Sequence, residues 1–404
     1  MRSKLSLRVT SNGMLYHLVC ITFVLELFVE PLFEVASYRF EWPYICCSIL
    51  FVALLITRKN YEFKGVAKSF IIFVVWCLAL LGVGTMRFRF DLVLVGLAHT
   101  MRMIVLFVPF LWILLSLTPY SRRTFYGVLR KYLLISLIAM FIMALFEGGI
   151  SNTKTFRTVG VGKNSLGYTI VCIQILFSVY ENKMLRVKPF HPCFWQTLCV
   201  LLCIFSKSGT AVAFSLFVLA WYMLKTVRTN VVGKGIIIVF VLLMGMCFLN
   251  VDVLIDLFKS LHVNKLSDFF YAFKYGGGET LGDTTDVRLK VQGDVLRDFN
   301  LDMALGRFYY YYFASHGFTA HQLYLQILYD TGIVGILLFA NFSYKCVKCS
   351  SAKVAVVMIF LYSFVEVFLI QYASLIILAL LVAYNSDEQS GNKYENSTSS
   401  ALCV

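Results

Sequence analysis

One histidine of this chain could act as a general base, because of its residue type and its position in the sequence. His321 stands in the stretch AHQLYLQILYDTGIVG and shares a helical face with Tyr324 and Leu328 by three-and-four spacing. A neutral imidazole can take a proton from an attacking hydroxyl. His321 is therefore the candidate base. The simpler alternative is an amphipathic anchor at an interface.

Four cationic side chains are candidates for binding the leaving group of such a reaction. They are Arg157, Lys163, Lys207 and Arg288. Cations neutralise a phosphate-linked leaving group, so that no general acid is needed. Simpler explanations stand beside this one: Lys207 can extend its ammonium group to lipid headgroups, and Arg288 can form a solvated ion pair of little energetic worth.

The stretch GVGKNSLG, residues 160–167, resembles a phosphate-binding loop only superficially. Arg157 stands where that motif has its first glycine, and Asn164 stands where it has Ser or Thr. We therefore reject a nucleotide site. Asn164 instead suits the N-cap of the helix that follows, and the functional alternative is a loop whose cations meet a polyanion.

The cysteines do not indicate a metal centre or a disulfide framework. Cys346 and Cys349 have metal-like spacing, but no second pair or histidine lies near them in the sequence. Most of the 12 cysteines lie inside apolar runs, where they act as small apolar residues. We expect no metal and no cofactor.

Composition places the chain in a membrane. Of its 404 residues, 59% are hydrophobic and 14% are charged, and the mean hydropathy is +0.78. A bilayer span needs about 20 apolar residues. We expect an all-α polytopic protein with roughly twelve spans: 14–36, 43–57, 69–86, 92–118, 132–148, 165–180, 194–206, 209–224, 235–251, 321–344, 354–371 and 373–385.

The basic residues orient these spans. With the N-terminus inside, every inner loop is basic and about 21 of the 36 Lys and Arg lie inside. The net charge of +14 is then mainly a topology signal and implies no nucleic acid. The rule leaves the outer cations unexplained: Lys154, Arg157, Lys163, Lys207, Arg288, Lys290, Arg297 and Arg307.

The same topology divides the chain into four parts. Residues 1–251 hold spans one to nine, 252–320 form a large outer loop, and 321–385 hold spans ten to twelve. The tail, 386–404, is polar and without periodicity, which predicts a disordered cytoplasmic segment. Within the loop we expect a helix over 285–298. Long loops are usually functional.

These features, in this order, resemble the O-antigen polymerase and O-antigen ligase superfamily of bacterial inner membranes. The resemblance rests on KNSLG at the start of a span, SKSG on a later one, a long outer loop with DVRLKVQGDVL and MALG, and then AHQLYLQILYDTGIVG. It covers about residues 155–345. The family commonly has asparagine after the histidine, where this chain has Gln322.

The resemblance implies a GT-C-like membrane glycosyltransferase that works without metal at the periplasmic face. Its donor would be an undecaprenyl-pyrophosphate-linked oligosaccharide. His321 matches the family's proposed base, and Arg288 matches the arginine of its long loop. Lys207 stands where the family more often has arginine, and a lysine binds pyrophosphate as a point charge without the two parallel bonds of an arginine.

Polymerase and ligase share these elements and differ in the acceptor, which is another lipid-linked repeat unit for the first and lipid A core sugar for the second. We favour the polymerase of lipopolysaccharide biosynthesis, with membrane lipids around it and a chain-length regulator as a partner that the resemblance allows. The ligase is the alternative. A transporter or flippase of the same lipid-linked sugar is the second alternative, and it would need charged residues at mid-membrane depth.

Overall fold

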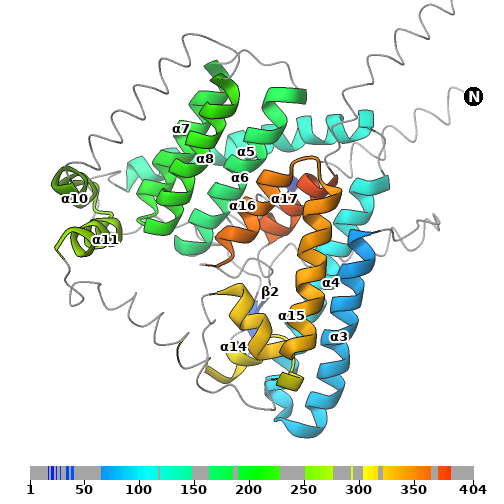
Figure 1. Cartoon of the computed structure of the whole chain (residues 1–404). Helices are drawn as coiled ribbons and strands as arrows, with labels where there is room; N and C mark the ends of the chain where they lie inside the picture. The colour runs from blue at the N-terminus through cyan, green and yellow to red at the C-terminus, as the bar shows by residue number, and fades with distance from the viewer. Residues whose placement is uncertain are drawn as a thin grey trace, which may run out of the picture.

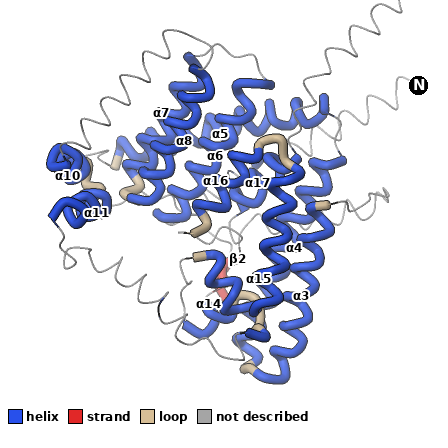
Figure 2. The backbone as a smooth tube through the Cα atoms, in the orientation of Figure 1, coloured by secondary structure: helices blue, strands red, loops and turns tan. Residues whose placement is uncertain are grey.

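A computed structural model of the chain is almost entirely helical in the part that it describes (Figures 1 and 2). The described residues are 33–35, 38–40, 65–116, 119–147, 163–184, 190–227, 251–275, 304–316, 322–364 and 372–383, with the single positions 17, 20, 21, 24, 28 and 293. The expected span 43–57 and the tail 386–404 lie outside them, as does all of the expected span 235–251 except its last residue.

Most of the expected spans that can be compared have a helix at nearly the same bounds. These helices are α3 (Val66–Arg87), α4 (Phe90–Ser116), α5 (Pro119–Phe146), α6 (Lys163–Met184), α7 (Phe190–Phe205), α8 (Gly209–Val227), α16 (Lys353–Tyr362) and α17 (Tyr372–Ala383). α5 begins well before the expected residue 132, and α16 ends before the expected 371. The remaining bounds lie close to the ends of the apolar runs in the sequence.

Among the described residues, three helical segments are long and apolar enough to cross a membrane: Val66–Arg87, Thr124–Phe146 and Leu323–Cys349. Shorter apolar helices lie at Leu166–Tyr180, Phe194–Phe205, Gly209–Leu224, Lys353–Tyr362 and Ser374–Ala383. A helical membrane protein is therefore the fold class, by the length and composition of its helices.

The expected first span, 14–36, is too long at its end. Strand β1 (Phe33–Val35) pairs antiparallel with β2 (Tyr38–Phe40), and Phe33 lies opposite Phe40. The physical reason is visible in the sequence, because Pro31 disfavours helix at the residue before it. Alternating aromatic and β-branched residues then favour strand.

The expected span 321–344 is a bent helix instead of a straight one. α15 (Leu323–Cys349) contains a kink at Gly332, which has φ 71° and ψ −171°. A β-carbon added at Gly332 would lie 2.5 Å from the carbonyl oxygen of Ala304 and 2.6 Å from the nitrogen of Gly306. Only glycine fits this left-handed, closely packed position. In the sequence, Asp-Thr-Gly at residues 330–332 interrupts the apolar run of this span at the kink.

Residues 252–320 are not a plain loop. They contain most of α10 (Val251–Ser260), together with α11 (Asn264–Tyr275) and α14 (Tyr311–His316). Phe258 of α10 and Phe270 of α11 stack with ring centroids 5.7 Å apart, so the two helices form a hairpin. Of the helix expected over 285–298, only Gly293 is described, and it is helical.

Two groups of helices make up the described core. α3 packs against α4 and against α15, while α6, α7 and α8 pack against one another. α17 contacts both α4 and α6, so it joins the groups. Figure 1 shows α3, α4 and α15 side by side, with the α10–α11 hairpin at the opposite edge beside α7 and α8.

A buried amide network fixes α6, α7 and α8 in register. Gln174 Nε2 donates to the Ser215 carbonyl oxygen at 3.1 Å, and Ser215 Oγ donates back to Gln174 Oε1 at 2.7 Å. Gln196 Nε2 donates to the Gln174 carbonyl oxygen at 3.1 Å and to Ser178 Oγ at 2.9 Å. Buried polar groups need such partners, so this network sets how α6 packs against α7 and α8.

Candidate functional site

The first turns of α6 and α8 touch at the end of the bundle where the KNSLG and SKSG motifs lie. A β-carbon added at Gly167 would lie 2.6 Å from Cβ of Ala211 and 3.3 Å from Cβ of Ser208. Glycine at position 167 therefore lets the two helix starts approach closely. Helix N-termini carry partial positive charge and unpaired N–H groups, so this junction is electropositive.

Lys207 lies in the turn between α7 and α8, at this junction. Its φ is 53°, and its Nζ donates to the carbonyl oxygen of Leu261, in the turn of the α10–α11 hairpin, at 3.1 Å. The side chain is 9% exposed, and burial lowers the pKa of Lys207. The ammonium group is therefore bonded within the protein, to the backbone of the hairpin.

The start of α15 reaches the same neighbourhood through α16. The backbone N–H of Leu323 donates to the carbonyl oxygen of Ser363 at 3.0 Å. The ring of Tyr362, the residue before Ser363, stacks on Tyr168 of α6 at 4.6 Å and packs against Phe214 of α8 at 4.4 Å. Three of the motifs, KNSLG, SKSG and AHQLYLQILYDTGIVG, thus have described residues in one connected cluster.

The structure describes only some of the predicted site residues. Lys207 has a described side chain, and Lys163 is the first residue of α6, with its side chain outside the description. His321, Arg288 and Arg157 lie outside the described residues, and their roles stay predictions. Gln322, which follows His321 in the sequence, is the N-cap of α15 and has no side-chain capping bond.

A buried carboxylate at the kink of α15 was not among the predicted site residues. Asp330 is 0% exposed. Its Oδ2 accepts from the backbone N–H of Tyr310 at 2.8 Å and from Gln326 Nε2 at 2.7 Å, and its Oδ1 accepts from the backbone N–H of Tyr312 at 2.8 Å. Asp330 therefore binds the end of the long segment to α15.

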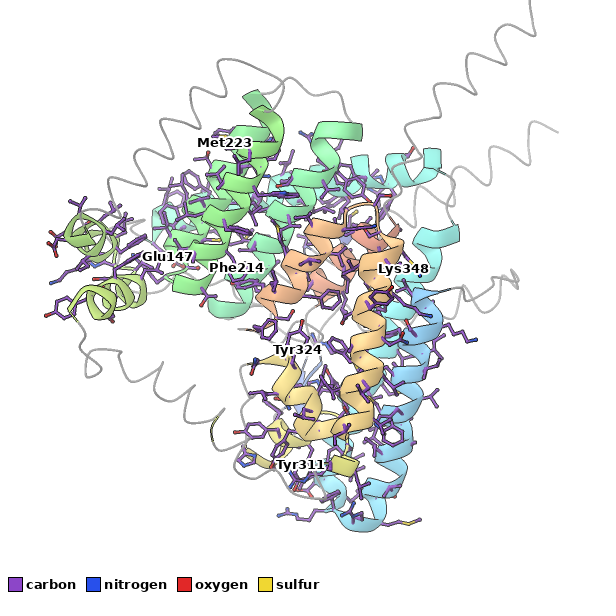
Figure 3. All side chains as sticks on the ribbon, in the orientation of Figure 1. Glu147, Phe214, Met223, Tyr311, Tyr324 and Lys348 are labelled. Carbon is purple, nitrogen blue, oxygen red and sulfur yellow. The ribbon has the colours of Figure 1, made fainter. Side chains whose placement is uncertain are left out.

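Two further bonds close the junction at the kink. The backbone N–H of Arg307 donates to the carbonyl oxygen of Asp330 at 2.8 Å, and Trp76 Nε1 of α3 donates to the carbonyl oxygen of Thr331 at 2.9 Å. These are carbonyls that a continuous helix would bond internally. The first arm of α15 is the part before the kink, residues 323–331. In Figure 3, Tyr324 of this arm lies toward α16, and Tyr311 of α14 lies at the other end of the arm, beside Tyr329.

α4 adds ionisable groups to the other side of the same segment. The ring of His99 stacks on Tyr310 at 3.7 Å, and His99 and Arg102 are 7% and 8% exposed. Arg102 and His99 both lie within the expected span 92–118, where His99 was not recognised as a candidate because a lone histidine in an apolar run gives no signal. Buried ionisable residues within membrane helices are functional candidates.

Within the described ranges, no group of three or more His, Cys, Asp or Glu side chains could hold a metal ion. Among those residues, the clusters offer cations, one buried carboxylate and aromatic rings. Such groups can bind and orient an anionic, sugar-bearing substrate. No family model matches the chain, and no curated protein matches it closely enough to indicate a relative.

Proposed function

We propose that the chain is an O-antigen polymerase of the bacterial inner membrane, with its active site at the periplasmic face. The observation that carries the proposal is the meeting of α6, the α7–α8 turn and the start of α15 in one cluster. These segments carry three of the motifs on which the resemblance rests, and they come from residues far apart in the sequence.

In this proposal the reaction is a single glycosyl transfer. An acceptor hydroxyl forms a bond to the anomeric carbon of the donor glycan while the bond from that carbon to the pyrophosphate oxygen breaks. The hydroxyl proton passes to His321, and undecaprenyl pyrophosphate leaves with the bond electrons. Lys207, Lys163, Arg157 and Arg288 are proposed to bind the pyrophosphate, whose charge grows in the transition state.

The first test is elongation by the purified full chain in detergent. Lipid-linked repeat units alone should be converted into a ladder of longer glycans if the protein is a polymerase. Transfer only to added lipid A core would identify a ligase. Deletion of the gene should leave core with one repeat unit for the polymerase and bare core with lipid-linked polymer for the ligase.

A transporter of the same lipid-linked sugar is a second candidate, because the structure buries His99, Arg102 and Asp330 inside helices. Such groups are what a path through the membrane would require. The detergent assay separates these functions, since transport has no meaning without compartments. Elongation there favours the enzyme, and its absence together with flux in vesicles favours the transporter.

Lys207→Met should lower turnover about ten- to a hundredfold, the loss expected from one hydrogen bond to a charged group. Methionine keeps the apolar stem but lacks the ammonium group. Lys207→Arg should retain activity, because arginine also carries donors for Leu261 and for phosphate. Steady-state rates at saturating donor check both variants.

The matched control for this prediction is Lys259→Met, since Lys259 is an exposed lysine near the end of α10. It should leave turnover unchanged. Equal rates for Lys207→Met and the wild type would remove Lys207 from the pyrophosphate site.

The proposed topology puts the α10–α11 hairpin outside and the α15–α16 turn inside. Ser260 is exposed in α10, and Cys349 is exposed at the end of α15. With a permeabilised outer membrane, Ser260→Cys should react with an impermeant thiol reagent in whole cells. The native Cys349 should react only after the inner membrane is opened, and the reverse pattern would overturn the orientation.

A further inference from the structure

Arg307 is held rigidly at the α15 kink, and nothing in the proposed mechanism uses it. Its guanidinium carbon lies 4.9 Å from the ring centre of Tyr311 and 4.4 Å from that of Tyr329. Stacking of this kind fixes the plane of a guanidinium group and leaves its N–H edges for an acceptor. The backbone of Arg307 is fixed as well, by its bond to Asp330.

Asp330 is the nearby carboxylate, but it does not pair with this arginine. Its two oxygens accept from Tyr310, Tyr312 and Gln326, and within the described part of the chain Arg307 forms no ion pair with it. The Nη1 group of Arg307 is buried and has no hydrogen-bond acceptor among the described residues. A buried donor of this kind requires a reason.

We propose that Arg307 binds an oxyanion, namely the pyrophosphate of the acceptor lipid, at a site separate from the donor pyrophosphate. This inference rests on the proposed function. A polymerase joins two lipid-linked substrates, so it must hold two pyrophosphates. Arginine binds such groups through two parallel N–H···O bonds.

The spacing along α15 suits this arrangement. Leu323, at the donor cluster, and Asp330, at the Arg307 cluster, are seven residues apart on the first arm of α15, which is about 10 Å at 1.5 Å per residue. The acceptor glycan lies between its own pyrophosphate and the hydroxyl that reacts. The two pyrophosphates must therefore be apart, at the two ends of a rigid element.

The test counts bound lipids. The full chain in nanodiscs of phosphatidylethanolamine would be titrated with undecaprenyl pyrophosphate and examined by native mass spectrometry. The wild type should bind two molecules and Arg307→Gln only one. Arg307→Lys, which keeps the charge, should bind the second at least tenfold more weakly. Arg89→Gln is the control, because Arg89 is an exposed arginine paired with Asp91, and it should bind two.

A competition arm separates the two sources of phosphate. Added phosphatidylglycerol should not displace the second molecule, since an ordinary headgroup carries one phosphate and the proposed ligand carries two. Displacement at equal concentration would show a general headgroup site and overturn the proposal.

An activity arm compares two acceptors: the repeat unit on undecaprenyl pyrophosphate and the same glycan on an uncharged alkyl chain. The wild type should prefer the first by about tenfold or more, and Arg307→Gln should lose that preference. Equal binding by the wild type and Arg307→Gln would refute this inference alone. If the wild type binds no undecaprenyl pyrophosphate, the proposed function fails with it.

Discussion

Replacement of His321 by alanine should lower turnover by roughly two to four orders of magnitude, the usual contribution of a general base. The acceptor hydroxyl would then have no group to take its proton as the new bond forms. Because the loss arises in the chemical step, binding of undecaprenyl pyrophosphate should stay near the wild-type value. Elongation rates at saturating donor, with binding measured in parallel, check the prediction.

His316→Ala is the matched control, because His316 is an exposed histidine of α14 whose loss should change turnover by less than about threefold. Protein amount in the membrane must be equal for both variants. Glycan synthesis by His321→Ala at the wild-type rate would assign this histidine to an interfacial anchor.

The helices whose bounds could be predicted are those in which apolar run length alone decides. α3, α8 and α17 begin and end within a few residues of the expected spans, because each is an uninterrupted apolar segment between polar ends. The kink at Gly332 was visible as a break in the pattern, since glycine is the residue that tolerates a positive φ. The sequence did not show that the break bends the expected span into two arms.

The contacts of Asp330 could not be predicted, because they join it to backbone N–H groups some 20 residues earlier in the chain. Backbone donors are present at every residue except proline, so the sequence gives no sign of which ones a carboxylate will bind. For the same reason Arg307 could be recognised as an unexplained cation, but not as one that lies over two tyrosine rings.

The position of Lys207 could be predicted, but its hydrogen-bond partner could not. Its place between α7 and α8 followed from the SKSG motif, whereas its bond to Leu261 depends on how the α10–α11 hairpin folds back. That hairpin lies in a segment where the sequence analysis expected a loop. The bond to Leu261 gives Lys207 a structural role in addition to the proposed binding of pyrophosphate.

Asp330→Ala should destabilise the protein strongly. Alanine leaves the N–H groups of Tyr310 and Tyr312 and the amide of Gln326 buried without their acceptor. Hydrogen bonds to a charged group are each worth about 1.5–3 kcal/mol, and their losses at one site are not additive. We expect a loss of about 3–5 kcal/mol in the free energy of unfolding, measured in detergent by denaturant titration.

Asp330→Asn is the sharper variant, because it keeps the side-chain volume and removes the charge. The asparagine amide has one acceptor oxygen, and its NH₂ group would face a backbone N–H, so at least one donor stays unpaired at a cost of about 1–3 kcal/mol. The unpaired donor also loosens the segment that follows Arg307, because Asp330 holds the backbone of Tyr310 and Tyr312. Glycan elongation should therefore fall further than stability alone explains.

Gln326→Leu removes one neutral partner of the same carboxylate and leaves its charge and both backbone bonds. It should reduce stability by about 1 kcal/mol and change elongation little. Asp256→Asn, at an exposed carboxylate of α10, should do neither. The ordering Asp330→Ala, then Asp330→Asn, then Gln326→Leu follows from the number of buried donors left unpaired. If Asp330→Asn unfolds and elongates like the wild type, the carboxylate does not hold residues 306–312 against α15, and the rigid placement of Arg307 needs another cause.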